Sequence, residues 1–274
     1  MMFALPFPAI DPVLIEIGPF AIRWYALAYV LGLILGWRYM LHLGRRLPGT
    51  MNALQVDDFL LWATLGVILG GRLGYVLFYN PIFFVNHPLQ IFAVWQGGMS
   101  FHGGLIGVIS ALILFCKFRG LSILRVGDLL VCAVPIGLLL GRVANFINGE
   151  LYGRATDVPW AMVFPNGGPI ARHPSQLYEA FGEGLVLVLL LWWMSHYTSA
   201  PRRPGLMAGT FLIGYGIARG TVEFFRQPDL QMGLIYSFVT MGQILSLPLV
   251  AVGFGLIWYA VTHPMISPPS PSAR

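Results

Sequence analysis

Four polar residues follow one of the most apolar stretches of this chain, at a point where a membrane-crossing helix would end. The run LLVCAVPIGLLL leads directly into GRVANFINGE, residues 141–150, which contains Arg142, Asn145, Asn148 and Glu150. A guanidinium group forms forked hydrogen bonds with phosphate or carboxylate groups. The segment therefore predicts an anion-binding group at the edge of a membrane.

Other apolar stretches also carry ionisable residues. Arg219, Glu223 and Arg226 are spaced i, i+4 and i+7, so they share one face of a helix. Ionisable groups at membrane depth are costly, usually face the interior of a bundle and mark function. Arg72 lies in a further apolar stretch. Three polar residues share a face of the helix expected after residue 175: Gln176, Glu179 and Glu183.

His102 is the candidate for proton transfer, because imidazole titrates near neutral pH. It lies in the stretch GGMSFHGGLIGV, between the glycine pairs Gly97–Gly98 and Gly103–Gly104. Glycine lets a backbone or a ligand come close, or lets a helix start late. For His102 taken alone, a hydrogen-bonded structural role is the alternative.

Membrane-crossing helices are the elements that must position these residues. The chain has 274 residues, of which 57% are hydrophobic and 10% are charged, whereas a soluble domain has roughly 25% charged residues. A crossing helix needs about 20 apolar residues, and we expect about seven such helices: 21–41, 57–79, 100–118, 128–147, 176–197, 205–225 and 236–261. We predict an all-α membrane bundle and a single domain, 1–274, with outer segments at about 80–99 and 148–175.

The basic residues in short loops predict the orientation of the bundle. The segment 80–99 has no basic residue. Basic residues fall instead in the first, third and fifth loops and in the tail: Arg38, Arg45, Arg46, Lys117, Arg119, Arg125, Arg202, Arg203 and Arg274. These loops and the C-terminus are predicted to be cytoplasmic and the N-terminus periplasmic. The start lacks a basic signal-peptide region, so we expect the first helix to be retained. By composition, HPMISPPSPSAR is expected to be a disordered tail.

The other basic residues lie on the outer side of the membrane in this arrangement, against the usual charge rule. They are Arg23, Arg72, Arg142, Arg154, Arg172, Arg219 and Arg226. Such a cluster suits an anionic lipid head group, and it indicates a membrane enzyme or carrier that acts on a phospholipid from the outer face. No Cys/His cluster has metal-ligand spacing and no basic run is typical of a nucleic-acid arm. We therefore expect no metal, no cofactor and no nucleic-acid partner.

A structural alternative exists for this polar group. The glutamates Glu179, Glu183 and Glu223 would neutralise Arg72, Arg142 and Arg219 as buried ion pairs. Tyr25 and Trp95 would be interfacial aromatic residues, and Asn145 and Asn148 would bond a helix end. This alternative explains poorly why polar groups from six segments converge on one membrane face.

The stretch GRVANFINGELYG, residues 141–153, closely resembles the motif of bacterial prolipoprotein diacylglyceryl transferases, Gly-Arg-x-x-Asn-Phe-x-Asn-x-Glu-x-x-Gly. It matches at Gly141, Arg142, Asn145, Phe146, Asn148, Glu150 and Gly153. Five further stretches resemble the family in order along the chain: GGRLGYVLFYN (70–80), GGMSFHGGLIG (97–107), RHPSQLYE (172–179), LIGYGIARGTVEFFRQPD (212–229) and MGQILS (241–246).

The resemblance implies a seven-helix bundle in the bacterial inner membrane, with the active site toward the periplasm. It implies transfer of the diacylglyceryl group of phosphatidylglycerol to the lipobox cysteine thiol of a prolipoprotein signal peptide. A thioether forms and glycerol 1-phosphate leaves. Because the acceptor brings its own nucleophile, the enzyme needs no catalytic serine or cysteine. We expect a monomer, since no second copy is needed to complete the site.

The resemblance also assigns roles to residues. It points to His102 as the base for the thiol and to Arg142 and Arg219 as the groups that stabilise the leaving phosphate. Substrate-binding positions carried over from the family are Tyr25, Arg142, Asn145, Glu150, Gly153 and Glu223. Asn145 is expected at the glycerol head group, and Glu223 is expected to orient Arg219. Roles in substrate access or bundle structure stay open for Arg72, Arg172, Arg226, Glu179 and Glu183.

Two other classes of protein compete with the transferase. A phospholipid or organic-anion transporter would use the same outer-face arginines as a binding site at a break in a helix. A weak similarity between GRLGYVLF and GRVANFIN hints at repeated units of that kind. A purely structural bundle leaves His102 and its glycines unexplained. Clustering of the polar groups on one face favours an enzyme.

Overall fold

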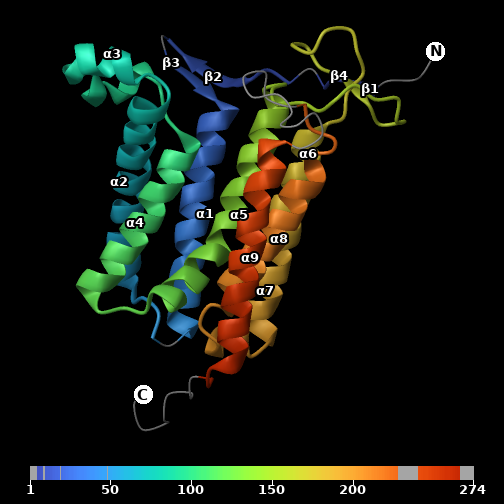
Figure 1. The fold of residues 1–274 in the computed structure, drawn as a ribbon. Coiled ribbons are helices and arrows are strands. Elements are labelled where there is room, and N and C mark those ends of the chain that lie inside the picture. Colours follow the sequence, from blue (N-terminus) through green and yellow to red (C-terminus); the bar gives the residue numbers. More distant parts are fainter. Residues whose placement is uncertain (1–4, 9, 19, 48, 228–239, 266–274) are drawn as a thin grey trace. The chain divides into compact units, whose positions relative to one another are not determined.

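The structure is a computed structural model that describes residues 5–8, 10–18, 20–47, 49–227 and 240–265 (Figure 1). The chain divides into two compact units. Unit 1 comprises residues 1–39 and 130–274, and unit 2 comprises residues 40–129. The boundaries pass through the helices α1 (Trp24–Arg46) and α5 (Ile123–Ile147). Most of the described residues are helical, which confirms the coarse part of the fold prediction.

Six helices among the described residues are long and apolar enough to cross a membrane. They are α1, α5, α2 (Ala53–Phe78), α4 (Phe101–Arg119), α9 (Met241–Thr262) and the continuous stretch Ser175–Tyr197. That stretch consists of α6 (Ser175–Glu179), the π-helical η3 (Ala180–Val186) and α7 (Leu187–Tyr197). Large apolar side chains are exposed along these helices. Such a surface fits a multi-pass membrane protein.

The stretch predicted as a helix at 205–225 forms α8 (Leu206–Val222), which has 17 residues and is shorter than the roughly 20 residues of a typical crossing helix. The predicted helix 236–261 begins at Met241 in the structure, and residues 236–239 lie outside the described part. The predicted disordered tail falls almost entirely on residues outside it. The first predicted helix, 21–41, begins at Trp24 and continues to Arg46.

Two short sheets depart from the predicted all-α class. Strand β2 (Val13–Ile17) pairs antiparallel with β3 (Phe20–Arg23), and β1 (Leu5–Pro6) pairs in parallel with β4 (Met162–Val163). The all-α prediction is therefore too simple outside the long helices. The sequence signal for this hairpin is VLIEIGPFAIR, where a Gly-Pro dipeptide separates two short runs that contain β-branched and aromatic residues.

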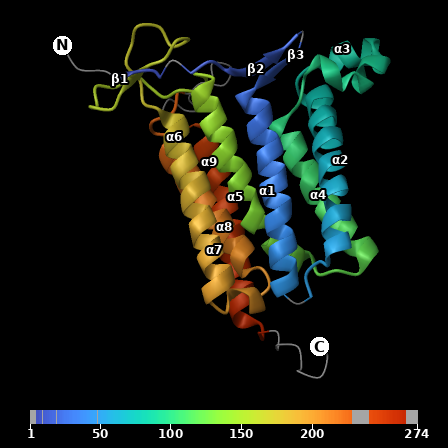
Figure 2. The same cartoon turned by 180° about the vertical axis from the view of Figure 1, so that it is seen from behind.

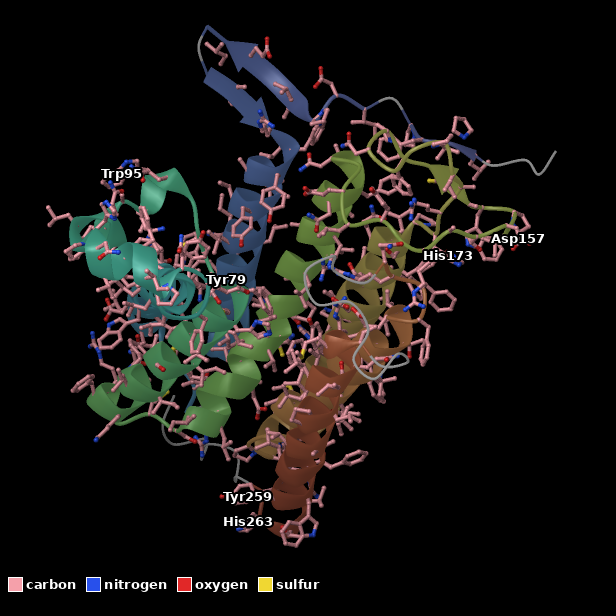
Figure 3. The ribbon with its side chains drawn as sticks, turned by 45° about the horizontal axis from the view of Figure 1, so that its top comes forward. Tyr79, Trp95, Asp157, His173, Tyr259 and His263 are labelled. Carbon is pink, nitrogen blue, oxygen red and sulfur yellow. The ribbon has the colours of Figure 1, made fainter. Side chains whose placement is uncertain are left out.

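In unit 2, α2 and α4 pack side by side (Figures 1 and 2). Glycines make this close approach possible: a Cβ atom on Gly66 would lie 2.6 Å from the carbonyl oxygen of Gly107. Three short helices follow α2, namely α3 (Pro81–Asn86), η1 (Pro88–Phe92) and η2 (Val94–Gln96). The side chain of Trp95 on η2 is exposed (Figure 3).

In unit 1, α7, α8 and α9 run alongside α5 (Figures 1 and 2), and the short η4 (Ala200–Arg202) connects α7 to α8. Close helix contacts again depend on glycine, since a Cβ atom on Gly184 would lie 2.7 Å from the Cα atom of Leu139. The loop that contains His173 lies at the end of the unit where α6 begins, whereas His263 lies at the opposite end, beyond α9 (Figure 3).

Candidate active site

A network of ion pairs in unit 1 joins α5, α6, η3 and α8. Among the described residues, it contains three carboxylates and three guanidinium groups, so that their formal charges balance. The members are Glu179, Glu183, Glu223, Arg142, Arg219 and Arg226. Arg142, Arg219 and Glu223 are site residues predicted from the sequence, and the structure brings all three into this network.

Glu179, the last residue of α6, joins the arginines of three segments. Its Oε1 atom accepts hydrogen bonds from Arg219 Nη1 at 2.6 Å and from Arg226 Nη1 at 2.8 Å. Its Oε2 atom lies 3.1 Å from Arg142 Nε. The Glu179 side chain is completely buried, and a buried carboxylate needs such partners to remain charged. Glu179 therefore holds the arginines close to one another.

Glu183 reaches the same arginines from the π-helical turn. Its carboxylate is completely buried and lies 3.7 Å from Arg142 Nη2 and 3.9 Å from Arg219 Nη1. A π-helical turn widens the helix by one residue and is frequent at functional sites. Here it lies between Glu179 and the regular helix α7. Gly184 then allows α5, which carries Arg142, to pack directly against this turn.

Arginines and carboxylates differ in exposure within the network. The side chains of Arg142 and Arg219 are 19% and 17% exposed, whereas those of Glu179 and Glu183 are 0% exposed. The two arginine side chains are therefore partly accessible, whereas the carboxylates of Glu179 and Glu183 are fully buried. The ion pairs foreseen as the structural alternative are formed for both arginines, and they leave both arginine side chains partly exposed.

The turn after α5 is organised by Glu150. Its Oε1 atom accepts hydrogen bonds from Asn145 Nδ2 at 2.8 Å and from Asn148 Nδ2 at 3.2 Å. Its backbone carbonyl accepts from Gln176 Nε2 at 2.6 Å, which ties the turn to the start of α6. Glu150 therefore fixes both asparagine amides and connects the polar end of α5 to the start of α6.

Gly153 lies where three backbone segments meet. Its N–H group donates to the carbonyl of His173 at 2.8 Å, and it pairs with Arg226 in an antiparallel bridge. A Cβ atom at this position would lie 2.5 Å from the carbonyl oxygen of Phe225 and 2.7 Å from the Cβ atom of His173. Because backbone atoms cannot give way easily, only glycine fits here.

We expect Gly153→Ala to destabilise this part of unit 1 by about 1–3 kcal/mol, the usual cost of an overpacked site. The measurement is the thermal unfolding of the purified protein, together with protease cleavage between residues 151 and 173. Gly141→Ala is the matched control, because a Cβ atom on Gly141 would meet nothing within 4 Å. Equal stability of the two variants would contradict this account of Gly153.

Arg154 and Arg172 connect the loop to the end of α8, Arg154 through a backbone carbonyl and Arg172 through the side chain of Gln227. Arg154 Nε donates to the carbonyl of Arg226 at 2.9 Å. Arg172 Nη1 donates to Gln227 Oε1 at 3.2 Å, and its guanidinium lies over the ring of Tyr152. These contacts support a structural role for Arg154 and Arg172, since both side chains hold the loop in place.

His173 lies in the same loop (Figure 3). Its Nδ1 atom lies 3.1 Å from the hydroxyl of Tyr178, and that hydroxyl accepts a hydrogen bond from Trp160 Nε1 at 2.6 Å. Burial lowers the pKa of the His173 imidazole, because the charged form loses hydration. The imidazole ring packs edge-on against Phe225, so His173 closes the loop over the end of α8.

Tyr25, the second residue of α1, belongs to unit 1 and lies within electrostatic reach of Glu150 and Arg142. Its ring lies 5.7 Å from that of Tyr29, and it is 40% exposed. The structure therefore brings Tyr25 to the same end of α5 as the predicted motif.

His102 belongs to unit 2, where it is the second residue of α4 and is exposed. Ser100 caps this helix by accepting a hydrogen bond from the N–H group of Gly103 at 3.1 Å. Of the glycines around His102, Gly97 and Gly98 adopt positive φ angles of 84° and 78°. Gly103 packs against α2. These glycines therefore form a turn and a helix contact that present His102 at the start of α4.

Arg72 in unit 2 is a structural anchor. Its guanidinium is buried and donates to backbone carbonyls of the segment after α3, and it lies over the ring of Phe84. The acceptors are Gln90 (2.5 Å), Ile91 (2.8 Å), Ala93 (3.2 Å), Gly97 (2.5 Å) and Gly98 (3.2 Å). For Arg72, the contacts therefore favour bundle structure over substrate access.

Replacing Arg72 by glutamine is expected to loosen residues 88–98. A hydrogen bond to a charged group contributes roughly 1.5–3 kcal/mol, so the loss of several should speed local amide exchange at least about 10-fold. Hydrogen–deuterium exchange would compare residues 88–98 with residues 105–115 of α4 in the same sample. Arg72→Lys is expected to behave like Arg72→Gln, because a single ammonium cannot serve acceptors on several sides. Unchanged protection in both variants would contradict the anchoring role.

The sequence indicates which residues belong to the network, but it does not indicate that Glu179 lies at the centre. Glu179 and Glu183 are visible as ionisable residues of an apolar stretch, but their roles stay open at that level. What the pattern does not reveal is that one oxygen of Glu179 serves both Arg219 and Arg226. Among the described residues, no group of three or more His, Cys, Asp or Glu side chains could hold a metal ion.

Comparison with known proteins agrees with the motif. Residues 12–259 match the family model described as prolipoprotein diacylglyceryl transferase. The chain is 64% identical to the phosphatidylglycerol–prolipoprotein diacylglyceryl transferase of Rhodospirillum rubrum over 255 residues, 92% of this chain and 93% of that protein. It is 59% identical to the protein of the same name from Paramagnetospirillum magneticum, over 95% of this chain and 97% of that protein. The corresponding values for Azospirillum brasilense are 57%, 96% and 99%.

The similarity extends over nearly the whole length of these relatives, and the range matched by the family model, 12–259, spans the turn after α5 and the residues of the ion-pair network. The resemblance predicted from GRVANFINGELYG is thereby confirmed. The chain belongs to the prolipoprotein diacylglyceryl transferase family.

Proposed function

We propose that this protein transfers the diacylglyceryl group of phosphatidylglycerol to the lipobox cysteine thiol of a prolipoprotein. The thiol loses its proton, and the sulfur attacks the carbon of the diacylglyceryl group that is bonded to the phosphate oxygen. The carbon–oxygen bond to the phosphate breaks, so a thioether forms and glycerol 1-phosphate leaves. The observation that carries the proposal is the pair of partly exposed arginines, Arg142 and Arg219, held by a buried carboxylate, in a chain whose relatives bear this enzyme name.

The two arginines would act on the phosphate of the leaving group. Negative charge grows on that phosphate as the carbon–oxygen bond breaks. N–H donors fixed beforehand at this position stabilise the transition state more than the ground state. Glu179 holds both guanidinium groups in place, and Glu223 pairs with Arg219 one helical turn away. The network therefore supplies donors that need little reorganisation during the reaction.

The remaining substrate-binding assignments concern the polar end of α5. Asn145 would bind the glycerol head group, with its amide held by Glu150. Gly153 would keep the loop close to the end of α8, where Arg226 pairs with it. Tyr25 would contact the substrate beside Arg142. His102 would take the proton of the thiol, because a thiol of pKa about 8.5 is mostly protonated at neutral pH and the thiolate is the nucleophile.

We further propose that the chain acts as a single domain, residues 1–274, and as a monomer in the bacterial inner membrane. It would cross the membrane seven times, with α8 as the sixth crossing, the N-terminus and active site in the periplasm and the C-terminus in the cytoplasm. The basic residues at the ends of α1 and α4 support this orientation. The substrates would be phosphatidylglycerol from the membrane and a lipobox signal peptide.

An in vitro reaction tests the proposed function. Purified protein would be mixed with phosphatidylglycerol and a lipobox peptide, with the cysteine-to-serine peptide as control. We expect a thioether-linked lipopeptide and an equal amount of glycerol phosphate, and neither with the control peptide. Movement of phosphatidylglycerol across vesicles without its consumption would instead favour a transporter.

A further inference from the structure

The Glu223 carboxylate is confined on several sides in unit 1. Its side chain is 5% exposed and pairs with Arg219, and Arg226 Nε lies 4.0 Å away. Its backbone is fixed as well, because its N–H group donates to the carbonyl of Arg219 at 3.1 Å and its own carbonyl accepts from Arg154 Nη2 at 3.4 Å. The carboxylate therefore has little freedom to change direction without leaving Arg219.

The first turn of α9 forms another boundary of this carboxylate. Gly242 is the second residue of α9, and a Cβ atom at this position would lie 2.6 Å from Glu223 Cδ, 2.7 Å from Oε1 and 2.9 Å from Cγ. Carbon atoms normally approach to about 3.5–4.0 Å. An alanine would thus have to displace the carboxylate by about 1 Å.

The backbone of Gly242 does not itself require glycine. This residue is absent from the described glycines with positive φ, and its helix begins with a complete capping box between Thr240 and Gln243. Within a helix, glycine costs roughly 0.5–1 kcal/mol relative to alanine. Glycine at this position is therefore explained by the space that Glu223 occupies.

Neither helix can retreat easily to make room. Helices α8 and α9 are in close contact, since a Cβ atom on Gly216 would lie 3.1 Å from the carbonyl oxygen of Ser246. About two turns away along the same interface, Gly209 and Gly253 are packed against each other in the same way. A side chain at position 242 would consequently be accommodated by turning Glu223 away from Arg219.

We propose that Gly242 is a positioning residue of the transfer reaction, because its lack of a side chain lets the Glu223 carboxylate hold Arg219 in the direction of the leaving phosphate. The inference rests on the proposed function. Gly242 would act through Glu223 on Arg219, and the contribution of Arg219 is greatest in the transition state. Gly242→Ala is therefore expected to lower kcat while the KM for phosphatidylglycerol changes little.

Three variants test this role: Gly242→Ala, Gly255→Ala and the double variant Gly242→Ala with Glu223→Asp. Gly255 is the matched control on the same helix, because a Cβ atom there would meet nothing within 4 Å. We expect kcat to fall roughly 10- to 100-fold in Gly242→Ala, as for a misplaced catalytic group, and to stay unchanged in Gly255→Ala. The shorter aspartate makes room for the methyl group. The double variant should therefore lose less than the product of the two single losses.

The outcomes separate the inference from the function on which it rests. If the unmodified protein makes no thioether product, both fail. If the unmodified protein is active and Gly242→Ala is equally active, the inference fails alone. It also fails if the losses of Gly242→Ala and Glu223→Asp multiply independently, or if Gly242→Ala raises KM with kcat unchanged. A melting temperature measured for every variant would show that the compared samples are folded.

Discussion

An Arg142→Ala variant is expected to transfer diacylglyceryl roughly 10²–10³-fold more slowly, the cost of removing one donor from an oxyanion-stabilising site. The physical reason is that Arg142 would donate to the leaving phosphate as its negative charge grows. The rate would be measured as thioether product formed from phosphatidylglycerol and a lipobox peptide. A folded Arg142→Ala protein with full activity would leave the guanidinium with a structural role only.

A charge-balanced double variant separates these two roles. Removing Arg142 alone leaves the buried carboxylates of Glu179 and Glu183 with too few partners, and breaking a buried ion pair costs roughly 3–5 kcal/mol. Adding Glu183→Gln removes the excess negative charge, so stability should largely return. Activity should stay low if Arg142 acts on the phosphate. Recovery of both stability and activity would identify Arg142 as a structural partner of the carboxylates.

His102→Gln is expected to abolish nearly all turnover near neutral pH, with a loss of at least about 10²-fold, typical of a missing general base. Binding of phosphatidylglycerol should persist, because the imidazole is assigned to the thiol. The same assay would give the rate, and a labelled phosphatidylglycerol would report binding. Wild-type turnover in His102→Gln would remove this residue from the reaction.

The pH dependence of the variant distinguishes a base from a structural histidine. Above neutral pH the peptide thiol ionises by itself, with a pKa of about 8.5. The rate of His102→Gln should then rise roughly 10-fold per pH unit until this pKa is reached, and the gap to the unmodified protein should narrow. His87→Gln is a suitable control, since His87 is another exposed histidine of unit 2. A rate deficit independent of pH would indicate a structural histidine.

The sequence predicts the long helices well because their signal is local. A run of apolar residues is visible in the composition of about 20 neighbours, and α2, α4 and the stretch Ser175–Tyr197 begin and end within a few residues of their predicted bounds. The hairpin of β2 and β3 is short, and its pairing depends on contacts that a search for apolar runs does not detect. The π-helical turn is equally invisible, since it differs from an α-helix only in backbone bonding.

The candidate site shows the same division. Charge placement alone groups Arg142 with Arg219 on one side of the membrane, and the structure brings them to a shared carboxylate. Charge placement also groups Arg72 with them, yet the Arg72 guanidinium donates to backbone carbonyls. Charge patterns report which residues need a partner. They do not report whether that partner is a carboxylate, a carbonyl or a substrate, because the partner is distant in the sequence.

The shared oxygen of Glu179 has a consequence for how this lineage can change over time. Because Arg219 and Arg226 both bond that oxygen, a substitution at Glu179 removes one partner from several cations at once. Variation at the centre of the network would therefore require simultaneous changes, which are rare, whereas isolated changes at its rim are tolerated. We expect a mutational library to show that no substitution at Glu179 is tolerated, whereas most substitutions on the exposed faces of the surrounding helices are tolerated.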